Sequence, residues 1–298
     1  MQNDFRSGFI ALLGRTNAGK STLLNKLIGQ KIAIVSDKPQ TTRNKIVGVL
    51  SKPEYQIVFL DTPGIHKPRH QLGQMMVSTA FKTLEGVDLI YYLIDVSVPF
   101  GSGESFLIER LQKVATPIFL LLNKIDLLPK EELLPLIDFY RQQREWTEIV
   151  PLSALKGENV EPLLAATLKY LPEGPKYYPE DVVTDQPEKI VAAEIIREKV
   201  LKLTHEEVPH SVAVVVEVLE ERTATLIYVG ATIFVERNSQ KAILIGKQGQ
   251  MLKQIGILAR KELEEIWGVA LYLDLWVKVS PAWREKEHYL RNFGYLPD

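Results

Sequence analysis

The octapeptide GRTNAGKS spans residues 14–21 and matches the phosphate-binding loop template, in which two glycines frame four residues and Lys and Ser follow. An apolar run of strand length (7–13) precedes the loop, and a segment with helical spacing that ends at Gly29 follows it. A strand, a glycine loop and a helix form the order that this template requires. The octapeptide therefore predicts an α/β domain that binds a nucleotide.

The residue types in this loop suit phosphate binding. Glycines let the loop bend so that backbone N–H groups converge on the α and β phosphates, while Lys20 reaches the β and γ phosphates. A helix that begins near Gly19 adds the positive end of its dipole, and the Ser21 hydroxyl is a ligand for Mg²⁺. The expected nucleotide contacts here are Gly14, Arg15, Thr16, Asn17, Ala18, Gly19, Lys20, Ser21 and Thr22.

Length and composition describe a globular chain. Its 298 residues suffice for two domains that each bury a core, and no apolar run of about 18 residues predicts a transmembrane helix. The N-terminal segment lacks the features of a signal peptide, so we expect a cytoplasmic protein. The absence of cysteine excludes disulfides and thiolate chemistry, and a net charge of −1 means that a nucleic-acid site must be a local patch.

Apolar runs alternate with helical patterns up to about residue 170, which predicts a mostly parallel sheet wound with helices. The expected strands are 8–13, 46–51, 55–61, 88–95, 117–123 and 148–151. The expected helices lie near 20–29, 72–84, 103–114, 131–143 and 159–170. Prolines and acids without apolar periodicity between 172 and 188 favour a linker. We expect one domain at 1–174, a linker at 175–188 and a second domain at 189–298.

The second domain shows the pattern of an α+β fold. A helical pattern at 188–204 opens it, with Asp185 as the expected N-cap and Pro187 in the first turn. The later expected elements are strands at 211–220 and 224–236 joined by an ERT turn, a helical stretch at 239–267 interrupted by GKQG, and a strand at 269–280.

The segment DTPG (61–64) ends an apolar strand about 40 residues after the phosphate loop. On its own it reads as an ordinary β-turn. After a phosphate loop, however, Asp61 is placed to hold Mg²⁺ through a water. The expected contacts of this segment are Asp61, Thr62, Pro63, Gly64 and Ile65.

The segment NKID (123–126) ends another apolar run and supplies an amide and a carboxylate. Asp126 can accept from guanine N1–H and the exocyclic amine, whereas adenine offers no donor at N1, so the pair disfavours ATP. Taken alone, Asn and Asp would read as caps of the next helix. The backbone amides of SALKG (153–157) can contact the guanine oxygen. The expected base contacts are Asn123, Lys124, Ile125, Asp126, Ser153, Ala154 and Leu155.

These segments occur in the order GRTNAGKS, TTR (41–43), DTPG, NKID and SALK, and together they resemble the translation-factor-like class of P-loop GTPases. Within that class the whole chain resembles the Era family of bacterial ribosome-assembly GTPases, among the TrmE-Era-EngA-like proteins. DKPQTTR (37–43), DTPGIHKPR (61–69) and IGKQGQMLKQIG (245–256) are the most distinctive segments. The resemblance implies a Ras-like GTPase domain followed by a type II KH domain with a C-terminal helix, a monomer, and GTP hydrolysis to GDP and phosphate.

The resemblance also implies roles for individual residues. Thr42, in preference to Thr41, matches the threonine that coordinates Mg²⁺ beside the γ phosphate, and the backbone N–H of Gly64 matches a γ-phosphate donor. The implied Mg²⁺ ligands are Ser21, Thr42 and Asp61, and the implied catalytic residues are Lys20, Thr42, Gly64 and Asn17.

Ile65 departs from the Ras pattern, in which a glutamine at this position orients the attacking water. Another group must therefore position the water in this chain. Asn17 matches the loop asparagine that binds K⁺ in potassium-stimulated relatives, and the alternative role for Asn17 is a turn former in left-handed geometry. We expect His66 and His70, which follow DTPG, to be loop residues and not metal ligands.

GKQG (246–249) supplies the GxxG loop with which KH domains clamp about four nucleotides. Between Arg237 and Lys261 there are six basic residues and no acid, although residues 181–298 carry 15 basic and 18 acidic side chains. The alternative is a solvated helix face with a glycine cap. The expected RNA contacts are Ile245, Gly246, Lys247, Gln248, Gly249 and Lys253, and the resemblance implies single-stranded RNA from the 3′ end of small-subunit (16S-type) ribosomal RNA. We expect Trp267, Trp276 and Trp283 to serve core or domain packing, with base stacking as the alternative.

The leading hypothesis is a GTPase switch that couples nucleotide state to RNA binding during maturation of the 30S subunit. One alternative is an RNA-binding scaffold whose nucleotide site is vestigial, which predicts binding without turnover. Another is a GTPase regulator of the cell cycle at the periphery of the cytoplasmic membrane, which needs an exposed basic amphipathic surface.

Overall fold

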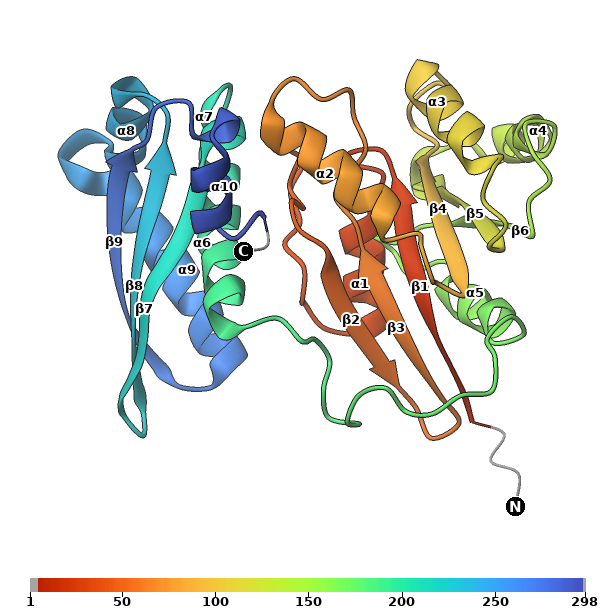
Figure 1. The fold of residues 1–298 in the computed structure, drawn as a ribbon, viewed down its shortest axis with the longest axis horizontal. Helices are drawn as coiled ribbons and strands as arrows, with labels where there is room; N and C mark the ends of the chain where they lie inside the picture. The colour runs from red at the N-terminus through yellow and green to blue at the C-terminus, as the bar shows by residue number, and fades with distance from the viewer. Residues whose placement is uncertain (1–4, 297–298) are drawn as a thin grey trace. The chain divides into compact units, whose positions relative to one another are not determined.

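The computed structural model describes residues 5–296, and within that range no helix is long and apolar enough to cross a membrane. The chain forms two compact units (Figure 1). Residues 5–35, 42–68 and 76–185 form the first unit, and residues 36–41, 69–75 and 186–296 form the second.

The first unit is built on a six-stranded sheet with the strand order β2-β3-β1-β4-β5-β6. Its strands are β1 (Arg6–Gly14), β2 (Ile46–Ser51), β3 (Tyr55–Asp61), β4 (Leu89–Asp95), β5 (Ile118–Asn123) and β6 (Glu148–Leu152). Only the edge pair β2 and β3 is antiparallel, and the other neighbours run parallel. The mostly parallel sheet expected from the alternating pattern is confirmed.

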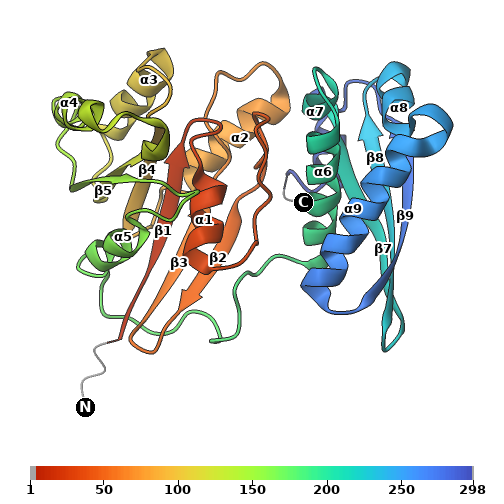
Figure 2. The same cartoon turned by 180° about the vertical axis from the view of Figure 1, so that it is seen from behind.

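Helices cover both faces of this sheet, as Figures 1 and 2 show from opposite sides. They are α1 (Lys20–Ile28), α2 (Gln71–Lys82), α3 (Ser102–Leu111), α4 (Lys130–Arg141) and α5 (Val160–Thr167). One core contains Leu23 of α1 and Leu163 of α5, and the other contains Leu107 of α3 and Tyr140 of α4. Burial on both faces explains why the central strands are continuous apolar runs without alternation.

Residues 175–185 belong to the first unit, although they fall in the segment expected to be a linker. The backbone N–H of Val49 donates to the carbonyl of Val183 at 2.9 Å, and the Thr184 hydroxyl donates to the carbonyl of Val47 at 2.8 Å. This segment therefore follows the edge strand β2 through hydrogen bonds.

The second unit has a three-stranded sheet in the order β7-β8-β9, in which β7 and β8 are antiparallel and β8 and β9 parallel. α6 and α9 lie on one face of the sheet, as Figure 2 shows. The elements are α6 (Glu188–Leu203), α7 (Val208–Ser211), β7 (Ala213–Thr223), β8 (Leu226–Val235), α8 (Asn238–Ile245), α9 (Gln250–Trp267), β9 (Ala270–Val279) and α10 (Glu287–Asn292), with short 3₁₀ turns at Lys247–Gly249 and Trp283–Glu285. The 3₁₀ turn Ile125–Leu127 belongs to the first unit.

Two local predictions for the second unit are wrong. Asp185 does not cap α6, because Pro187 occupies the N-cap position and Asp185 accepts from the Tyr178 hydroxyl at 3.2 Å. The connection between β7 and β8 is not ERT, because β7 continues through Thr223 and leaves a tighter turn before Leu226. A register shift between Val216 and Val218 lets the strand pair accommodate this length.

Candidate nucleotide site and nucleic-acid groove

The phosphate loop connects β1 to α1, and its glycines are required by close approaches. A Cβ at Gly14 would lie 2.5 Å from the carbonyl oxygen of Leu93. A Cβ at Gly19, where φ is +96°, would overlap the side-chain amide of Asn123. Asn17 also adopts left-handed geometry, with φ of 63°, and is exposed. The geometry suits both roles that we considered for Asn17.

Lys20 begins α1 and is buried. Its ammonium donates to the carbonyl oxygens of Arg15 at 3.0 Å and Gly14 at 3.3 Å. Burial lowers the pKa of Lys20, and the nearby Asp61 charge raises it. The carbonyl groups of the phosphate loop therefore hold the Lys20 ammonium at the place where we expect the phosphates to bind.

Ser21, Thr42 and Asp61 meet in one cluster. The Ser21 hydroxyl lies 2.8 Å from that of Thr42 and donates to Oδ2 of Asp61 at 2.6 Å. Burial raises the pKa of Asp61 to about 6, although the Lys20 charge lowers it. The other carboxylate oxygen, Oδ1, is buried without a hydrogen-bond partner. Two hydroxyls and a carboxylate with an unsatisfied oxygen are a donor set that fits Mg²⁺.

The DTPG segment packs directly on the phosphate loop. The Thr62 hydroxyl donates to the carbonyl of Leu12 at 2.7 Å, and the backbone N–H of Ile65 donates to the carbonyl of Gly14 at 3.1 Å. A Cβ at Gly64 would lie 2.6 Å from the Cα of Thr16, so this contact requires glycine. The Ile65 side chain is buried in the core and does not face the loop's polar groups.

The two histidines after DTPG bond to the backbone. Nδ1 of His66 lies 3.1 Å from the carbonyl oxygen of Gly64, and Nδ1 of His70 accepts the N–H of Gly73 at 2.9 Å. Across residues 5–296 no group of three or more His, Asp or Glu side chains is arranged to hold a metal ion.

The base-recognition segments are connected through Asn123, which ends β5. Lys124 has left-handed geometry, with φ of 70°, and its ammonium bonds to Asp95 at the end of β4. Asp126 is exposed, and Leu155 is 71% exposed, so both side chains are open to a ligand. The Ser153 hydroxyl turns inward and accepts from the N–H of Lys156 at 3.1 Å.

Two residues of this site were missed by the sequence interpretation. Asp95 holds Lys124, and Glu104, in the first turn of α3, forms an ion pair with Arg15 of the phosphate loop. Asp95 could have been found, because it ends a parallel strand next to the one that ends at Asn123. Nothing in the sequence signalled Glu104.

In the second unit, GKQG separates α8 from α9 in a conformation that requires its glycines. Gly246 and Gly249 have φ of +71° and +77°. A Cβ at Gly246 would lie 2.7 Å from that of Met251, whereas a Cβ at Gly249 would meet open space. Lys247 and Gln248, between the glycines, are exposed. The loop can thus present its backbone closely to a ligand.

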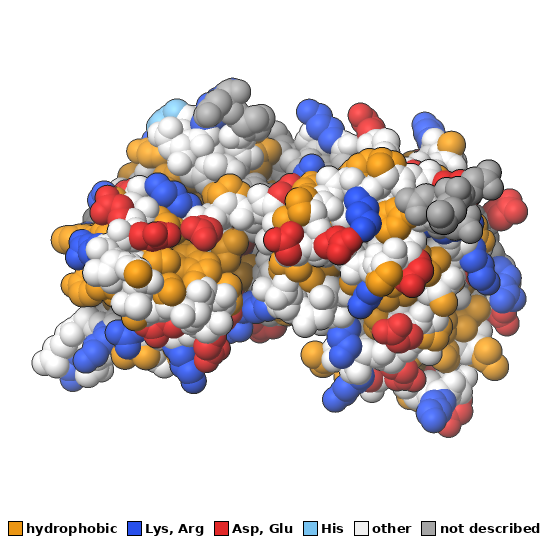
Figure 3. All heavy atoms as spheres, turned by 90° about the horizontal axis from the view of Figure 1, so that it is seen from below, with side chains coloured by type: hydrophobic (Ala, Val, Ile, Leu, Met, Phe, Trp, Pro, Cys, Tyr) orange, Lys and Arg blue, Asp and Glu red, His pale blue; other side chains and the backbone are white. Residues whose placement is uncertain are grey.

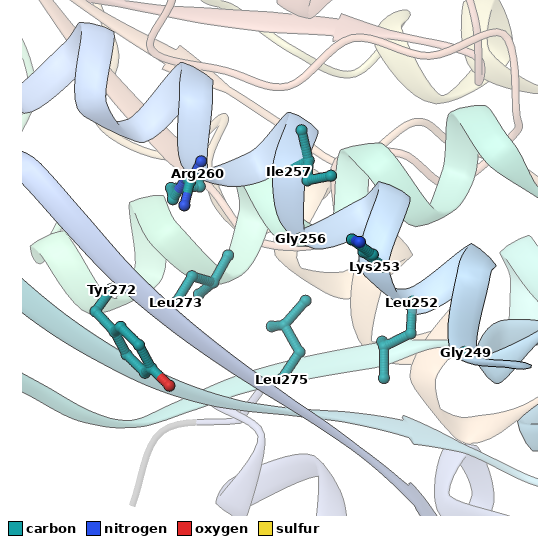
Figure 4. A pocket seen from close by; sticks show the side chains of 9 residues that line it. All are labelled: Gly249, Leu252, Lys253, Gly256, Ile257, Arg260, Tyr272, Leu273 and Leu275. Atoms are coloured by element: carbon teal, nitrogen blue, oxygen red, sulfur yellow. The ribbon is translucent and has the colours of Figure 1, made fainter.

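A groove of about 430 Å³ runs from this loop between α9 and β9 (Figure 4). Leu252 from α9 and Leu273 and Leu275 from β9 point toward one another across it. Lys253 and Arg260 line the helix side, so the groove has an apolar floor and a basic rim. Of the expected RNA contacts, Gly249 and Lys253 line the groove, while Ile245, Gly246, Lys247 and Gln248 lie in or next to the loop at its end.

The three tryptophans of the second unit differ in exposure. Trp283 is fully buried and donates from its indole N–H to the carbonyl of Ser211 at 2.8 Å, and Trp267 is partly buried. Trp276 is 59% exposed, which excludes the core alternative of its expected role. Figure 3 shows hydrophobic side chains gathered on the second unit (orange, left), with charged side chains of both signs at their edge.

Two family models match the chain. Residues 9–124 match a family described as 50S ribosome-binding GTPase, and residues 207–284 match the KH domain. These matches coincide with the phosphate-loop unit and with the groove of the second unit.

Two solved structures are similar over almost the whole chain. One is Era in complex with MgGDPNP and nucleotides 1506–1542 of 16S ribosomal RNA, at 45% identity and a TM-score of 0.95, covering 98% of this chain and 99% of that one. The other is a point variant of Era from Aquifex aeolicus bound to GDP·AlF₄⁻, at 45% identity and a TM-score of 0.93, with the same coverage. This chain is a GTPase with a C-terminal KH domain, and it belongs to the Era family.

Proposed function

We propose that this GTPase is a molecular switch that binds the 3′ region of small-subunit ribosomal RNA and assists assembly of the 30S subunit. The observation that carries the proposal is the bonding of Ser21 to both Thr42 and Asp61, beside the buried Lys20. This cluster joins the phosphate loop to two segments that a γ phosphate would contact. The groove beside the GxxG loop is the surface on which the switch would bind a nucleic acid.

Mg²⁺ is the metal that this cluster suits, and the related Era complex contains MgGDPNP. Ser21 and Thr42 would bind the ion through their hydroxyls, and Asp61 through a water. When bound, Mg²⁺ neutralises charge on the β and γ phosphates.

The chain's own groups account for most of the remaining phosphate chemistry. Lys20 stabilises negative charge on the β and γ phosphates from its fixed position at the start of α1. The backbone N–H of Gly64 donates to the γ phosphate, and the tight packing of Gly64 on Thr16 sets its position. The buried Ile65 cannot orient the attacking water, so backbone groups, a nearby side chain of the segment around DTPG or a cation bound at Asn17 must do so. We propose K⁺ as that cation.

Guanine selection follows from the base segments. The exposed carboxylate of Asp126 accepts from guanine N1–H and the exocyclic amine, while the backbone near Ala154 faces the guanine oxygen. ATP would leave the carboxylate without a donor at N1. Competition of unlabelled ATP against labelled GTP measures this preference directly.

Single-stranded RNA suits the groove of the second unit. The loop glycines allow close approach of a phosphate backbone, Lys253 and Arg260 supply positive charge, and the leucine floor receives bases. The related Era complex with 16S ribosomal RNA supports the 3′ region as the target. Binding to this RNA would place the protein, as a monomer, in the cytoplasm with the 30S subunit.

The experiment that tests the proposal combines turnover and RNA mapping. Single-turnover hydrolysis of GTP separates the switch from an RNA-binding scaffold, which would bind GTP without cleaving it. Crosslinking of the full chain to a ribosomal RNA pool, in GTP-analogue and GDP states, identifies the bound sites. Crosslinks spread evenly over the pool would contradict the 3′-end target.

A further inference from the structure

Arg15 connects the phosphate loop to a helix outside it. Its guanidinium Nη1 donates to Oε2 of Glu104, in the first turn of α3, at 2.7 Å. The carbonyl oxygen of the same arginine accepts from the Lys20 ammonium at 3.0 Å and from the backbone N–H of Ala18 at 3.4 Å. The side chain of Arg15 thus anchors the residue whose backbone holds Lys20.

The surroundings of this ion pair are shaped for it. A Cβ at Gly103 would lie 2.7 Å from Nε of Arg15, so a larger residue at this position would displace the guanidinium. The carboxylate of Glu104 is buried and lies in the first turn of α3. Tyr92 and Tyr140 lie close enough to this ion pair to feel both charges. Burial raises the pKa of each phenol most, the Glu104 charge raises it further, and the Arg15 charge lowers it.

We propose that Arg15 is a positioning residue for nucleotide binding, and that its ion pair with Glu104 holds the phosphate loop in the conformation that receives the phosphates. This inference rests on the proposed nucleotide site. Without the ion pair, the Arg15 carbonyl and Lys20 are free to move, and a nucleotide must order the loop when it binds. GDP and GTP both carry the β phosphate, so both lose affinity by the same factor. Once the nucleotide is bound the loop is ordered again, and hydrolysis at saturating GTP keeps its rate.

Three variants break the link in different ways. Arg15→Ala removes the guanidinium, Glu104→Gln removes the charge of its partner, and Gly103→Ala displaces the guanidinium while both charges remain. Each should weaken GDP and GTP-analogue binding, with a loss of about 10-fold or more expected for Arg15→Ala, since a charge-assisted hydrogen bond is at stake. The turnover rate of Glu104→Gln and Gly103→Ala at saturating GTP should stay within about twofold of wild type.

Arg6→Ala is the matched control, because Arg6 starts the strand that leads into the phosphate loop. Arg6 bonds to the carbonyls of Leu168 and Leu171 at the far end of that strand. Its loss should lower the melting temperature of the first unit and leave nucleotide affinity unchanged. The control therefore shows whether a general loss of stability by itself weakens nucleotide binding.

Fluorescent GDP titration and displacement kinetics of the full chain give the readout. Support requires weaker binding in all three variants, and a double variant of Arg15→Ala and Glu104→Gln no weaker than the worse single one. Wild-type affinity in Arg15→Ala, or a reduced turnover rate with unchanged affinity, would overturn the positioning role. A wild-type chain that bound no guanine nucleotide would instead overturn the proposed nucleotide site.

Discussion

The side chain of Asn123 bonds to both loops that flank it: its amide donates to the carbonyl of Ala18 at 2.8 Å, and its carbonyl accepts the N–H of Ala154 at 2.9 Å. Ala18 belongs to the phosphate loop, and Ala154 to the segment expected at the guanine oxygen. One buried side chain therefore connects the phosphate and base sites. An alternative role as a helix cap would leave these bonds unexplained.

Asn123→Ala should weaken nucleotide binding and the fold together. The substitution leaves a buried carbonyl and a buried N–H without partners, which costs about 1–3 kcal/mol for each group. We expect a lower free energy of unfolding, measured by urea denaturation, and a GDP affinity reduced by about 10-fold or more. Asn292→Ala, on the exposed face of α10, is the control. GDP affinity equal to wild type would show that the bridge is dispensable.

Asp61 should make the metal-free protein more stable as the pH falls from 7 toward 5. Its pKa is raised to about 6 in the folded chain, above the ordinary value of 3.8, so the folded state binds the proton first. Stability then rises by up to about 1.4 kcal/mol per pH unit below pH 6, and levels off below the unfolded pKa. Denaturation curves of wild type and Asp61→Asn, compared at each pH without Mg²⁺, isolate this contribution. A difference between the two curves that did not change with pH would refute it.

Asn17→Gly separates the two roles of Asn17. Glycine keeps the left-handed geometry, with φ of 63° in the structure, but removes the side-chain oxygen. If Asn17 binds K⁺, hydrolysis should be faster in K⁺ than in Na⁺ for wild type and equal in both for Asn17→Gly. Asn17→Ala adds backbone strain and should bind nucleotide less well than the glycine variant. Equal turnover of wild type in K⁺ and Na⁺ would remove the potassium role.

Gly249→Asp should weaken RNA binding without unfolding the second unit. The position has open space for a side chain, and aspartate tolerates left-handed geometry better than most residues. The new charge lies where a phosphate would approach, so we expect an affinity loss of about 10-fold. Gly268→Asp is the matched control, since Gly268 caps the other end of α9 with φ of +69° and equal open space. Filter binding should show a loss of RNA affinity only for Gly249→Asp. Equal losses of affinity in the two variants would contradict a role of the GKQG loop in RNA binding.

Residue pattern predicted the elements of the first unit well, because β1, β3, β4 and β5 are apolar runs that end in a glycine, an acid or an amide. It failed where contacts between residues distant in sequence determine the local structure. Asp185 has a cap residue's chemistry, but the N-cap position belongs to Pro187, and Asp185 bonds instead to the Tyr178 hydroxyl. The four-residue helix α7 was not expected, since it is too short for a periodic signal.

The same distinction applies to the sites. Loop glycines and polar residues at strand ends can be identified from their spacing, so the sequence predicted the segments that the structure brings together at Ser21, Thr42 and Asp61. Glu104 belongs to a helix with an ordinary amphipathic sequence, which gives no sign of a functional residue. Its contact with Arg15 becomes visible only in the folded chain. The exposure of Trp276 could not be predicted, because a strand's two faces are equivalent in sequence until the helices cover one of them.

RNA affinity as a function of the bound nucleotide tests the central claim most directly. Fluorescence anisotropy of a labelled single-stranded RNA with the sequence of the small-subunit 3′ end would be measured with the full chain, saturated with Mg²⁺ and either a GTP analogue or GDP. We expect tighter binding in the GTP-analogue state, by about 5-fold or more, and loss of that binding in Gly249→Asp. Equal affinity in both nucleotide states would contradict a switch that controls RNA binding.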